Sequence, residues 1–450
     1  MSTPVTTAVD GGAAPPVRLV FPTLVEGAEL VGEFKNSGYK EPQQLVSLPN
    51  RQLVQLPALL FLVVKILHDH RHLVGHRDPA AALAVVADAV SAAAGARITA
   101  EQVAFLTEKK LAPLGITTYL DGQAPPIVKA NPFLSLRYRM SVAPEKATWF
   151  IGGVFSWLFR PPVVVLMVTA FVCCEIYLFG TQSMGDALRH VLLAPLTILL
   201  VLGLAIASCV FHEVGHATAC RYSGVRPGVM GCGIYLVWPA FYTDITESYR
   251  LGRAGRIRTD LGGVYFNTIF VTALTCVYLY TGFPPLLVAM LYVNFEILQQ
   301  LLPTLRFDGY YIMSDLCGIP DLFKYIGPIL KRAVLRRPAD DRLKALKRWP
   351  QAVVTFWVLA VFPALIVQLT ILAARVPDLV RTDWQMMQDL GRAAANGAGP
   401  LELFVAGLQI VLLALPIIGL GLITYQLLKW LSGKALLLLL PRPKGAHRMK

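Results

Sequence analysis

Two histidines and a glutamate lie close together in a stretch of sequence that is otherwise apolar. His212, Glu213 and His216 fall in the segment CVFHEVGHATAC, directly after a run of about twenty mostly apolar residues. Ionisable side chains at the depth of a lipid bilayer are costly unless they are paired or bound to a ligand. The spacing HExxH supplies a reason for them, because it is a pattern with which a helix binds zinc.

The residue types indicate hydrolytic chemistry at a metal. In a helix, His212 and His216 lie one above the other on a single face, where both imidazoles can bind one zinc ion. Glu213 then flanks the open coordination position, where it can take a proton from the attacking water and pass it to a leaving amine. A catalytic zinc has three protein ligands. We therefore expect a third ligand, and Asp308 in the segment LRFDG is the candidate, with Asp244 the next to test.

The composition places these residues in a membrane protein. The chain has 450 residues, of which 55% are hydrophobic, and a mean hydropathy of +0.56. Residues 1–147 carry the charges and helix breakers of a soluble domain, whereas the long apolar runs follow residue 148. A bilayer-spanning helix needs about 20 apolar residues. About six spans are predicted, at 161–179, 191–216, 261–281, 286–303, 351–374 and 402–428.

The net charge of +13 is concentrated in alternate loops of the membrane part. Loop 221–258 holds six Arg and loop 304–349 holds ten Lys/Arg, whereas residues 281–285 hold no charge. This alternation follows the positive-inside rule and favours a lipid bilayer over a nucleic acid as the partner. It predicts a multi-pass protein of the cell membrane with both termini in the cytoplasm. HExxH and Asp308 then lie on the same side of the membrane.

The fold class predicted is mostly α, with a small soluble domain before the membrane part. We expect a disordered N-terminus at 1–19, an α/β winged-helix-like domain at 20–122 and a linker at 123–147. A membrane-embedded domain at 148–435 and a basic cytoplasmic tail at 436–450 complete the chain. No charged segment followed by an apolar core opens the sequence, so the first span is expected to act as the targeting signal.

Local signals define elements inside these domains. In the N-terminal domain, RQLVQLP (51–57) predicts a strand, three helical patterns follow, and Thr99 and Gln102 have the spacing of a capping box. Residues 224–251 combine Gly, Pro and β-formers, which predicts a re-entrant β hairpin beside the site. The seven cysteines, an odd number mostly inside apolar runs, predict free thiols.

Two further groups of polar residues have competing interpretations. His68, His72 and His76 recur at four-residue spacing and offer a second metal site, but a solvated helix end is favoured because no acidic or Cys partner adjoins them. Asp244 either lines the site or is an ordinary turn carboxylate. The basic run 324–348 is interpreted as an amphipathic segment facing lipid.

FHEVGH on an apolar helix, followed by LRFDG, resembles the site-2 protease family of intramembrane zinc metalloproteases. In this sequence two tyrosines follow the Asp-Gly pair, and this DGYY form of the motif resembles the peptide zinc metalloprotease branch of that family. The resemblance implies one zinc per chain, with His212, His216 and Asp308 as ligands and Glu213 as the base. LGGVYFN resembles the family's G-x-x-x-N element, which implies substrate contacts for Gly263 and Asn267. The sequence departs from the family at LRF, where Asn-Pro is common.

The pattern of strand and helices over residues 45–120 resembles the PqqD-like domains that recognise peptides. That resemblance implies binding of a leader peptide by strand addition at a sheet edge. The alternative is a generic winged helix, but fourteen Lys/Arg against twelve Asp/Glu in residues 1–150 argue against DNA as its partner.

These patterns together predict an intramembrane zinc metalloendopeptidase. Its expected substrate is a peptide precursor, as in leader removal during maturation of a ribosomally synthesised modified peptide. One alternative is regulated cleavage of a membrane-bound signalling protein. Another is a non-catalytic membrane transporter or binding protein with a structural zinc, which would not need Glu213. The sequence predicts no oligomeric state.

Overall fold

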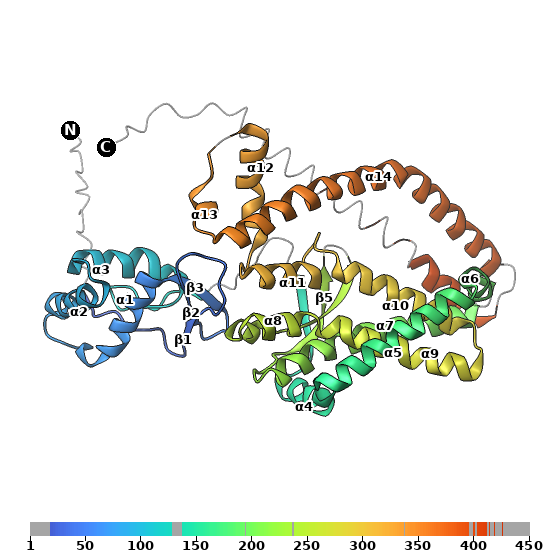
Figure 1. Cartoon of the computed structure of the whole chain (residues 1–450), viewed down its shortest axis with the longest axis horizontal. Coiled ribbons are helices and arrows are strands. Elements are labelled where there is room, and N and C mark those ends of the chain that lie inside the picture. Colours follow the sequence, from blue (N-terminus) through green and yellow to red (C-terminus); the bar gives the residue numbers. More distant parts are fainter. Residues whose placement is uncertain are drawn as a thin grey trace, which may run out of the picture. The chain divides into compact units, whose positions relative to one another are not determined.

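The computed structural model describes residues 19–127, 137–193, 195–235, 238–336, 338–395, 399–400 and 403–411, together with positions 414, 418 and 425. The chain divides between Ala130 and Asn131 into two compact units. Helices dominate the described residues of the larger, C-terminal unit (Figure 1). Apart from Leu19, the N-terminus and the basic tail discussed above lie outside the described residues.

The N-terminal unit combines one antiparallel sheet with three helices. The strands follow the order β1 (Glu29–Glu33), β2 (Gln43–Ser47) and β3 (Leu53–Pro57). The helices are α1 (Ala58–Asp69), α2 (Pro79–Ala94) and α3 (Ala100–Leu106). The predicted strand at 51–57 and the three helices are confirmed, and β1 and β2 extend the sheet beyond that prediction.

Capping residues explain where these helices begin and end. Asp78 caps α2, since its Oδ1 accepts hydrogen bonds from the backbone N–H groups of Ala80 (3.0 Å) and Ala81 (3.2 Å). Gly95 ends α2 with φ of 64°, a left-handed conformation that glycine adopts without strain. The predicted capping box of α3 is confirmed, because Thr99 and Gln102 exchange side-chain hydrogen bonds with each other's backbone.

The N-terminal unit has its own hydrophobic core. Val63 and Leu67 of α1, Val86 and Val90 of α2 and Val103 of α3 are all at most 1% exposed. The spacing of four residues in α1 and in α2 places each pair on one face of its helix. The unit therefore has the packing of an independent domain, while its likeness to peptide-recognition domains stays a prediction.

Three helices of the C-terminal unit are long and apolar enough to cross a membrane. They are α5 (Pro161–Thr181), α7 (Pro195–Tyr222) and α9 (Gly262–Thr281), and their most apolar windows have mean hydropathies of 2.3, 2.1 and 1.4. These helices correspond to the first three predicted spans. α7 continues six residues past the predicted end at 216 and is preceded by a separate helix, α6 (Met184–Leu193).

The other three predicted spans are not shown by the structure. α10 (Pro285–Leu301) is apolar but has only 17 residues, about 25 Å at 1.5 Å per residue, which is shorter than the hydrocarbon core. The fifth falls inside α14 (Arg348–Ala395), a helix of 48 residues that runs far past the expected end. The sixth, at 402–428, lies largely outside the described residues.

Glycines let α7 and α9 approach closely. A Cβ atom on Gly215 of α7 would overlap the carbonyl of Gly262 in α9, and the reverse holds as well. Helices in membranes pack through such small residues because apolar side chains gain little over lipid. On another side of α7, Gly152 of α4 (Glu145–Phe155) lies against the carbonyl of Ala217. The backbone of α7, which carries HExxH, is thus in close contact with the backbones of α9 and α4.

A second antiparallel sheet completes the C-terminal unit. Its order is β4 (Arg137–Ala143), β5 (Met230–Tyr235) and β6 (Trp238–Thr243). The predicted hairpin is confirmed by β5 and β6, which pair from Met230–Thr243 to Tyr235–Trp238. The predicted linker 123–147 is wrong in its second half, because residues 137–143 pair with β5. That pairing is long-range and leaves no signal in the local sequence.

Short helices connect these larger elements. They are α8 (Arg253–Asp260), α11 (Asp308–Cys317), α12 (Ile326–Leu335) and α13 (Asp341–Lys344). α8 packs against both α7 and α11. The basic run at 324–348 includes α12, α13 and the first residue of α14.

Candidate metal centre and catalytic residues

Three predicted ligands meet at one point of the structure. Asp308 Oδ2 lies 3.1 Å from His212 Nε2 and 3.4 Å from His216 Nε2, and the two Nε2 atoms are 3.1 Å apart. Tetrahedral zinc with ligands at about 2.0–2.1 Å separates neighbouring donors by roughly 3.3 Å. The three donor atoms therefore fit zinc. Among the described residues they form the single group of His, Cys, Asp or Glu that could hold a metal.

Two elements far apart in sequence bring these donors together. α7 supplies both histidines from one face, as the i, i+4 spacing predicts. Asp308 is the first residue of α11 and follows a short connection from the end of α10 in which Phe307 is extended. Gly309 allows the start of α11 to approach the end of α10, since a Cβ atom there would overlap the carbonyl of Leu301. In the Asp-Gly pair, Asp308 thus supplies a donor atom for the metal and Gly309 allows the close packing of the backbone.

Neighbouring backbone groups orient the two imidazoles. His216 Nδ1 lies 2.8 Å from the carbonyl oxygen of Thr259 at the end of α8, so Nδ1–H donates there and Nε2 is left for the metal. Such an outer hydrogen bond fixes the tautomer of a ligating histidine. His212 rests against Gly263 of α9, where a Cβ atom would overlap the ring. Both ligands are buried, with exposed fractions of 3% for His212 and 6% for His216.

Glu213 is held by a residue that the sequence analysis missed. The hydroxyl of Thr243, at the end of β6, lies 2.8 Å from Glu213 Oε2 and 3.0 Å from the carbonyl oxygen of Glu213. The hydroxyl can donate its proton to the carboxylate and so fix its orientation beside the metal ligands. Thr243 directly precedes Asp244, a candidate from the sequence, but nothing local to a threonine marks this contact.

The three predicted ligands, Glu213 and Thr243 line one cavity of about 460 Å³. Residues of β6 and the following turn also contribute to the lining, among them Tyr242 and Asp244. A cavity of this size holds a few residues of an extended peptide. The arrangement can bind a metal, present a carbonyl to it and move a proton through Glu213.

The charge of Asp308 is favoured by its surroundings. Burial by itself raises the pKa of this carboxyl, but the facing imidazoles of His216 and His212 outweigh burial and hold the pKa below its usual range. Asp308 is therefore an anionic oxygen donor, the form that a zinc ligand requires.

A buried ion pair joins two of the helices that hold the site. Arg256 of α8 is fully buried and donates from Nε to Asp315 Oδ1 of α11 at 2.9 Å. Burial, followed by the neighbouring Asp315, raises the pKa of Asp260 well above its usual range. Burial raises the pKa of Asp315 as well, although the guanidinium of Arg256 opposes that shift. The pair ties α8, which orients His216, to α11, which begins with Asp308.

Breaking this pair should destabilise the C-terminal unit. Arg256→Met leaves Asp315 buried without its partner, and loss of one member of a buried pair typically costs about 3–5 kcal/mol. We expect a clearly lower midpoint of thermal unfolding in nanodiscs, followed by tryptophan fluorescence. Lys344→Met removes an exposed pair with Asp341 (3.0 Å) and should change the midpoint little. Equal midpoints for the two variants would contradict a supporting role for Arg256.

The two predicted substrate residues lie apart from the cavity. Gly263 packs on the ring of His212, as described above, and Asn267 is fully buried. Asn267 Oδ1 accepts a hydrogen bond from Ser208 Oγ at 3.3 Å, which joins α9 to α7. Neither residue lines the cavity. The structure gives both a role in helix packing, and contact with substrate stays a prediction.

The remaining polar candidates are resolved by their contacts. Asp244 lines the cavity, but its Oδ1 accepts hydrogen bonds from the backbone N–H (3.0 Å) and hydroxyl (2.6 Å) of Thr246. It is thus a turn carboxylate that also faces the site. Within the described residues, His68, His72 and His76 belong to no group that could hold a metal. The seven cysteines are free thiols, as predicted.

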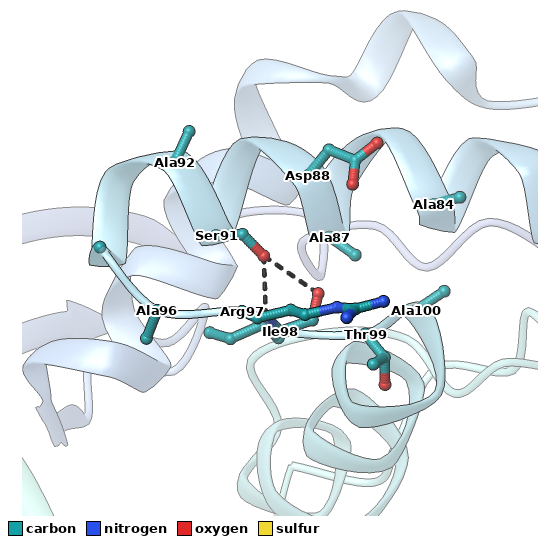
Figure 2. Close-up of a pocket in the computed structure, with 11 residues that line it drawn as sticks. Ala84, Ala87, Asp88, Ser91, Ala92, Ala96, Arg97, Ile98, Thr99 and Ala100 are labelled. Atoms are coloured by element: carbon teal, nitrogen blue, oxygen red, sulfur yellow. Dashed lines mark hydrogen bonds between the residues drawn. The ribbon is translucent and has the colours of Figure 1, made fainter.

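A second hollow lies in the N-terminal unit, between α2 and the turn into α3 (Figure 2). Ser91 occupies its wall and holds the turn, because its hydroxyl accepts from Ile98 N–H (2.8 Å) and donates to Ile98 O (3.0 Å). Asp88 and Arg97 also line it (Figure 2). The polar atoms of Ser91 are used within the fold, and we assign this hollow no function.

Comparison with known proteins gives one informative similarity. The chain is 28% identical over 122 residues to a Bacillus subtilis (strain 168) protein named "Putative peptide zinc metalloprotease protein YydH". The aligned part covers 27% of this chain and 48% of that protein, so about half of the relative's length is matched. No protein family and no solved structure matches the chain. At the level of class, the similarity supports a zinc metalloprotease, in agreement with the metal centre.

Proposed function

We propose that this protein is a zinc-dependent endopeptidase of the cell membrane, of the site-2 protease type, that cleaves a peptide precursor. The observation that carries the proposal is the convergence of His212, His216 and Asp308 within 3.4 Å of one another, with Glu213 in the same cavity. A structural zinc needs four protein ligands and no adjacent base. Here the ligand set is three, which leaves one position for water or substrate.

The residues present can perform hydrolysis of a peptide bond. A zinc ion held by the three donors would polarise the scissile carbonyl and lower the pKa of water to about 7. Glu213 accepts the proton from the attacking water and then delivers it to the nitrogen of the leaving amine. The hydroxyl of Thr243 fixes the orientation of the Glu213 carboxylate in the cavity through its 2.8 Å hydrogen bond. Burial of the ligands excludes competing water from the metal's other sides.

The sheet beside the site suggests how an extended substrate binds. Within the described residues, β6 is an edge strand, and it ends at Thr243 beside Glu213. A peptide that adds to such an edge forms backbone hydrogen bonds independent of its sequence. We infer that the substrate pairs with β6, which would carry a backbone carbonyl past the metal centre.

The membrane setting and the precursor substrate are parts of the same proposal. α7 carries the ligands and is one of the three helices able to cross a bilayer. We place both termini in the cytoplasm, from the alternation of basic loops. Maturation of a ribosomally synthesised modified peptide is the favoured role. Regulated cleavage of a membrane-bound signalling protein is the alternative within the same chemistry, and a non-catalytic zinc transporter or binding protein is the alternative outside it.

Metal removal tests the proposal directly. The full chain in nanodiscs is incubated with a precursor peptide encoded by a neighbouring gene, and products are identified by mass spectrometry. We expect cleavage that stops after zinc is removed with a chelator and returns when about one zinc per chain is restored. Cleavage that persists in the metal-free protein would contradict a zinc mechanism. Zinc binding without cleavage of precursors or of membrane-protein candidates would favour the non-catalytic alternative.

Removal of residues 1–122 should separate recognition from chemistry. The N-terminal unit has its own core, and every metal ligand and Glu213 lie in the other unit. A tethered recognition domain raises the local substrate concentration to roughly millimolar for a short flexible tether. We expect a higher apparent KM for the full precursor and an unchanged kcat in the truncated protein, measured by steady-state kinetics.

The truncated protein must begin near residue 123 so that β4, which starts at Arg137, still pairs with β5. A short peptide that spans only the cleaved bond is the control and should be processed equally by both forms. If the truncated protein is loaded with zinc and fails on the short peptide as well, the N-terminal unit belongs to the catalytic apparatus.

A further inference from the structure

A single carboxylate interrupts the apolar helix α10. Glu296 is the one charged residue between Pro285 and Leu301, and it is only 9% exposed. Its Oε1 accepts a hydrogen bond from the thiol of Cys209 on α7 at 3.4 Å. Among the described residues its other oxygen, Oε2, has no hydrogen-bond partner. A carboxylate in such surroundings is costly, which calls for a partner or a function.

A second buried polar atom close by also lacks a partner. His212 Nδ1 forms no hydrogen bond within the described part of the chain, although the residue is 3% exposed. Its Nε2 faces the other two metal donors, so Nδ1 must carry the proton. A metal-ligating histidine almost always donates that proton to a carboxylate, carbonyl or water. His216 does so to Thr259, at 2.8 Å, whereas His212 has no such acceptor on its own helix.

The two unpartnered atoms belong to the same interface. Cys209 and His212 are three residues apart on α7 and therefore share a face, and Cys209 contacts Glu296 directly. α7 and α10 pack against each other. The imidazole of His212 is confined by Gly263 of α9, where a Cβ atom would overlap the ring.

We propose that Glu296 is a positioning residue for the metal centre: it accepts, through an ordered water, the hydrogen bond that His212 Nδ1–H must make. The contact fixes the tautomer with Nε2 free and holds the ring against Gly263. The negative charge makes the imidazole a stronger donor to the metal. A water between His212 Nδ1 and Glu296 Oε2 would supply a hydrogen-bond partner to both of these buried atoms. The inference rests on the proposed function only for the identity of the metal.

Zinc affinity tests this role without any measurement of cleavage. The full chain in nanodiscs is titrated with zinc against a competing chelator. Loss of an outer partner of a ligand typically weakens metal affinity about 10–100-fold. We expect a loss of that size for Glu296→Leu and an intermediate loss for Glu296→Gln, which keeps an acceptor but no charge. The visible spectrum of the cobalt-substituted protein should shift in the same order.

Glu175 provides a matched control. It is a carboxylate on α5 that accepts hydrogen bonds from Asn294 of α10 at 3.0 and 3.1 Å, and it does not line the cavity of the metal site. Glu175→Gln should keep the zinc affinity and the cobalt spectrum of the wild type. Should Glu296→Leu fail to fold, Glu296→Gln decides. Wild-type affinity together with an unchanged cobalt spectrum in a folded Glu296 variant would overturn the proposal.

The outcomes separate this inference from the proposed function. If zinc binding weakens in the Glu296 variants while the wild type cleaves no peptide, Glu296 positions His212 in a protein that is not a peptidase. If the wild type cleaves and the Glu296 variants keep their zinc, the peptidase stands and the inference is wrong.

Discussion

Glu213→Gln is expected to abolish cleavage while the protein keeps about one zinc per chain. Glutamine preserves the size of the side chain and an oxygen that can accept the hydroxyl of Thr243, which lies 2.8 Å from Glu213 Oε2 in the wild type. It cannot take a proton from water. Loss of a general base lowers the rate by about 10²–10⁴-fold. The measurement is the single-turnover rate on the precursor peptide, with zinc content determined by elemental analysis of the same sample.

A neighbouring carboxylate controls for a general loss of negative charge. Glu247 pairs with Arg250 at 2.6 Å in the turn that follows β6, outside the cavity lining. Glu247→Gln should therefore leave the rate unchanged. Wild-type cleavage by zinc-loaded Glu213→Gln would remove the base from the mechanism. It would also leave the site without a residue to protonate the leaving amine.

Asp308→Ala is expected to lose the metal as well as the activity. Asp308 Oδ2 lies within 3.4 Å of both histidine donors, and without it two imidazoles leave zinc under-coordinated. We expect zinc content well below one per chain after dialysis, in contrast to Glu213→Gln. Cleavage should fall with zinc content and should recover only partly at high zinc concentration.

Asp244→Ala is the matched comparison for the third ligand. Asp244 is a second aspartate that lines the cavity, but its carboxylate is used to hold Thr246 in the turn after β6. This variant should keep its zinc, with at most a loss of stability from the freed turn. Full zinc occupancy in Asp308→Ala, together with loss of zinc in Asp244→Ala, would show that the third ligand was assigned wrongly.

Local sequence determined the helices and the two histidine ligands. The i, i+4 spacing of His212 and His216 places both imidazoles on one helical face wherever that helix lies. The capping box of α3 followed in the same way, because Thr99 and Gln102 act on each other's backbone groups three residues away. Interactions of this range depend on adjacent residues alone, so they can be predicted without knowledge of the fold.

Membrane spans were predicted less well than helices. Hydropathy averages composition over a window and does not register where a helix breaks. The segment 191–216 includes the end of α6 and most of α7, and the segment 286–303 corresponds to α10, a helix of 17 residues. Three of the six predicted spans correspond to helices that meet the length and composition of a membrane helix.

The tertiary structure alone decided how the metal ligands are supported. Asp308 was proposed from a motif, but its distance of 3.1 Å from His212 results from the packing of α10 against both α7 and α11. Thr243, the carbonyl of Thr259 and Glu296 carry no signal in local sequence, since a threonine or a backbone carbonyl is chemically ordinary until a distant segment faces it.

The reason lies in the range of the forces involved. The sequence determined which donor atoms exist and which of them share a helix, because helical periodicity is local. Packing of α7 against α8, α9, α10 and β6 decided which atoms orient those donors. His216 and Thr259 are 43 positions apart in the chain, and Glu213 and Thr243 are 30 apart. The need for glycine at a position such as Gly263 likewise follows only from the fold, which packs the ring of His212 where a Cβ atom would lie.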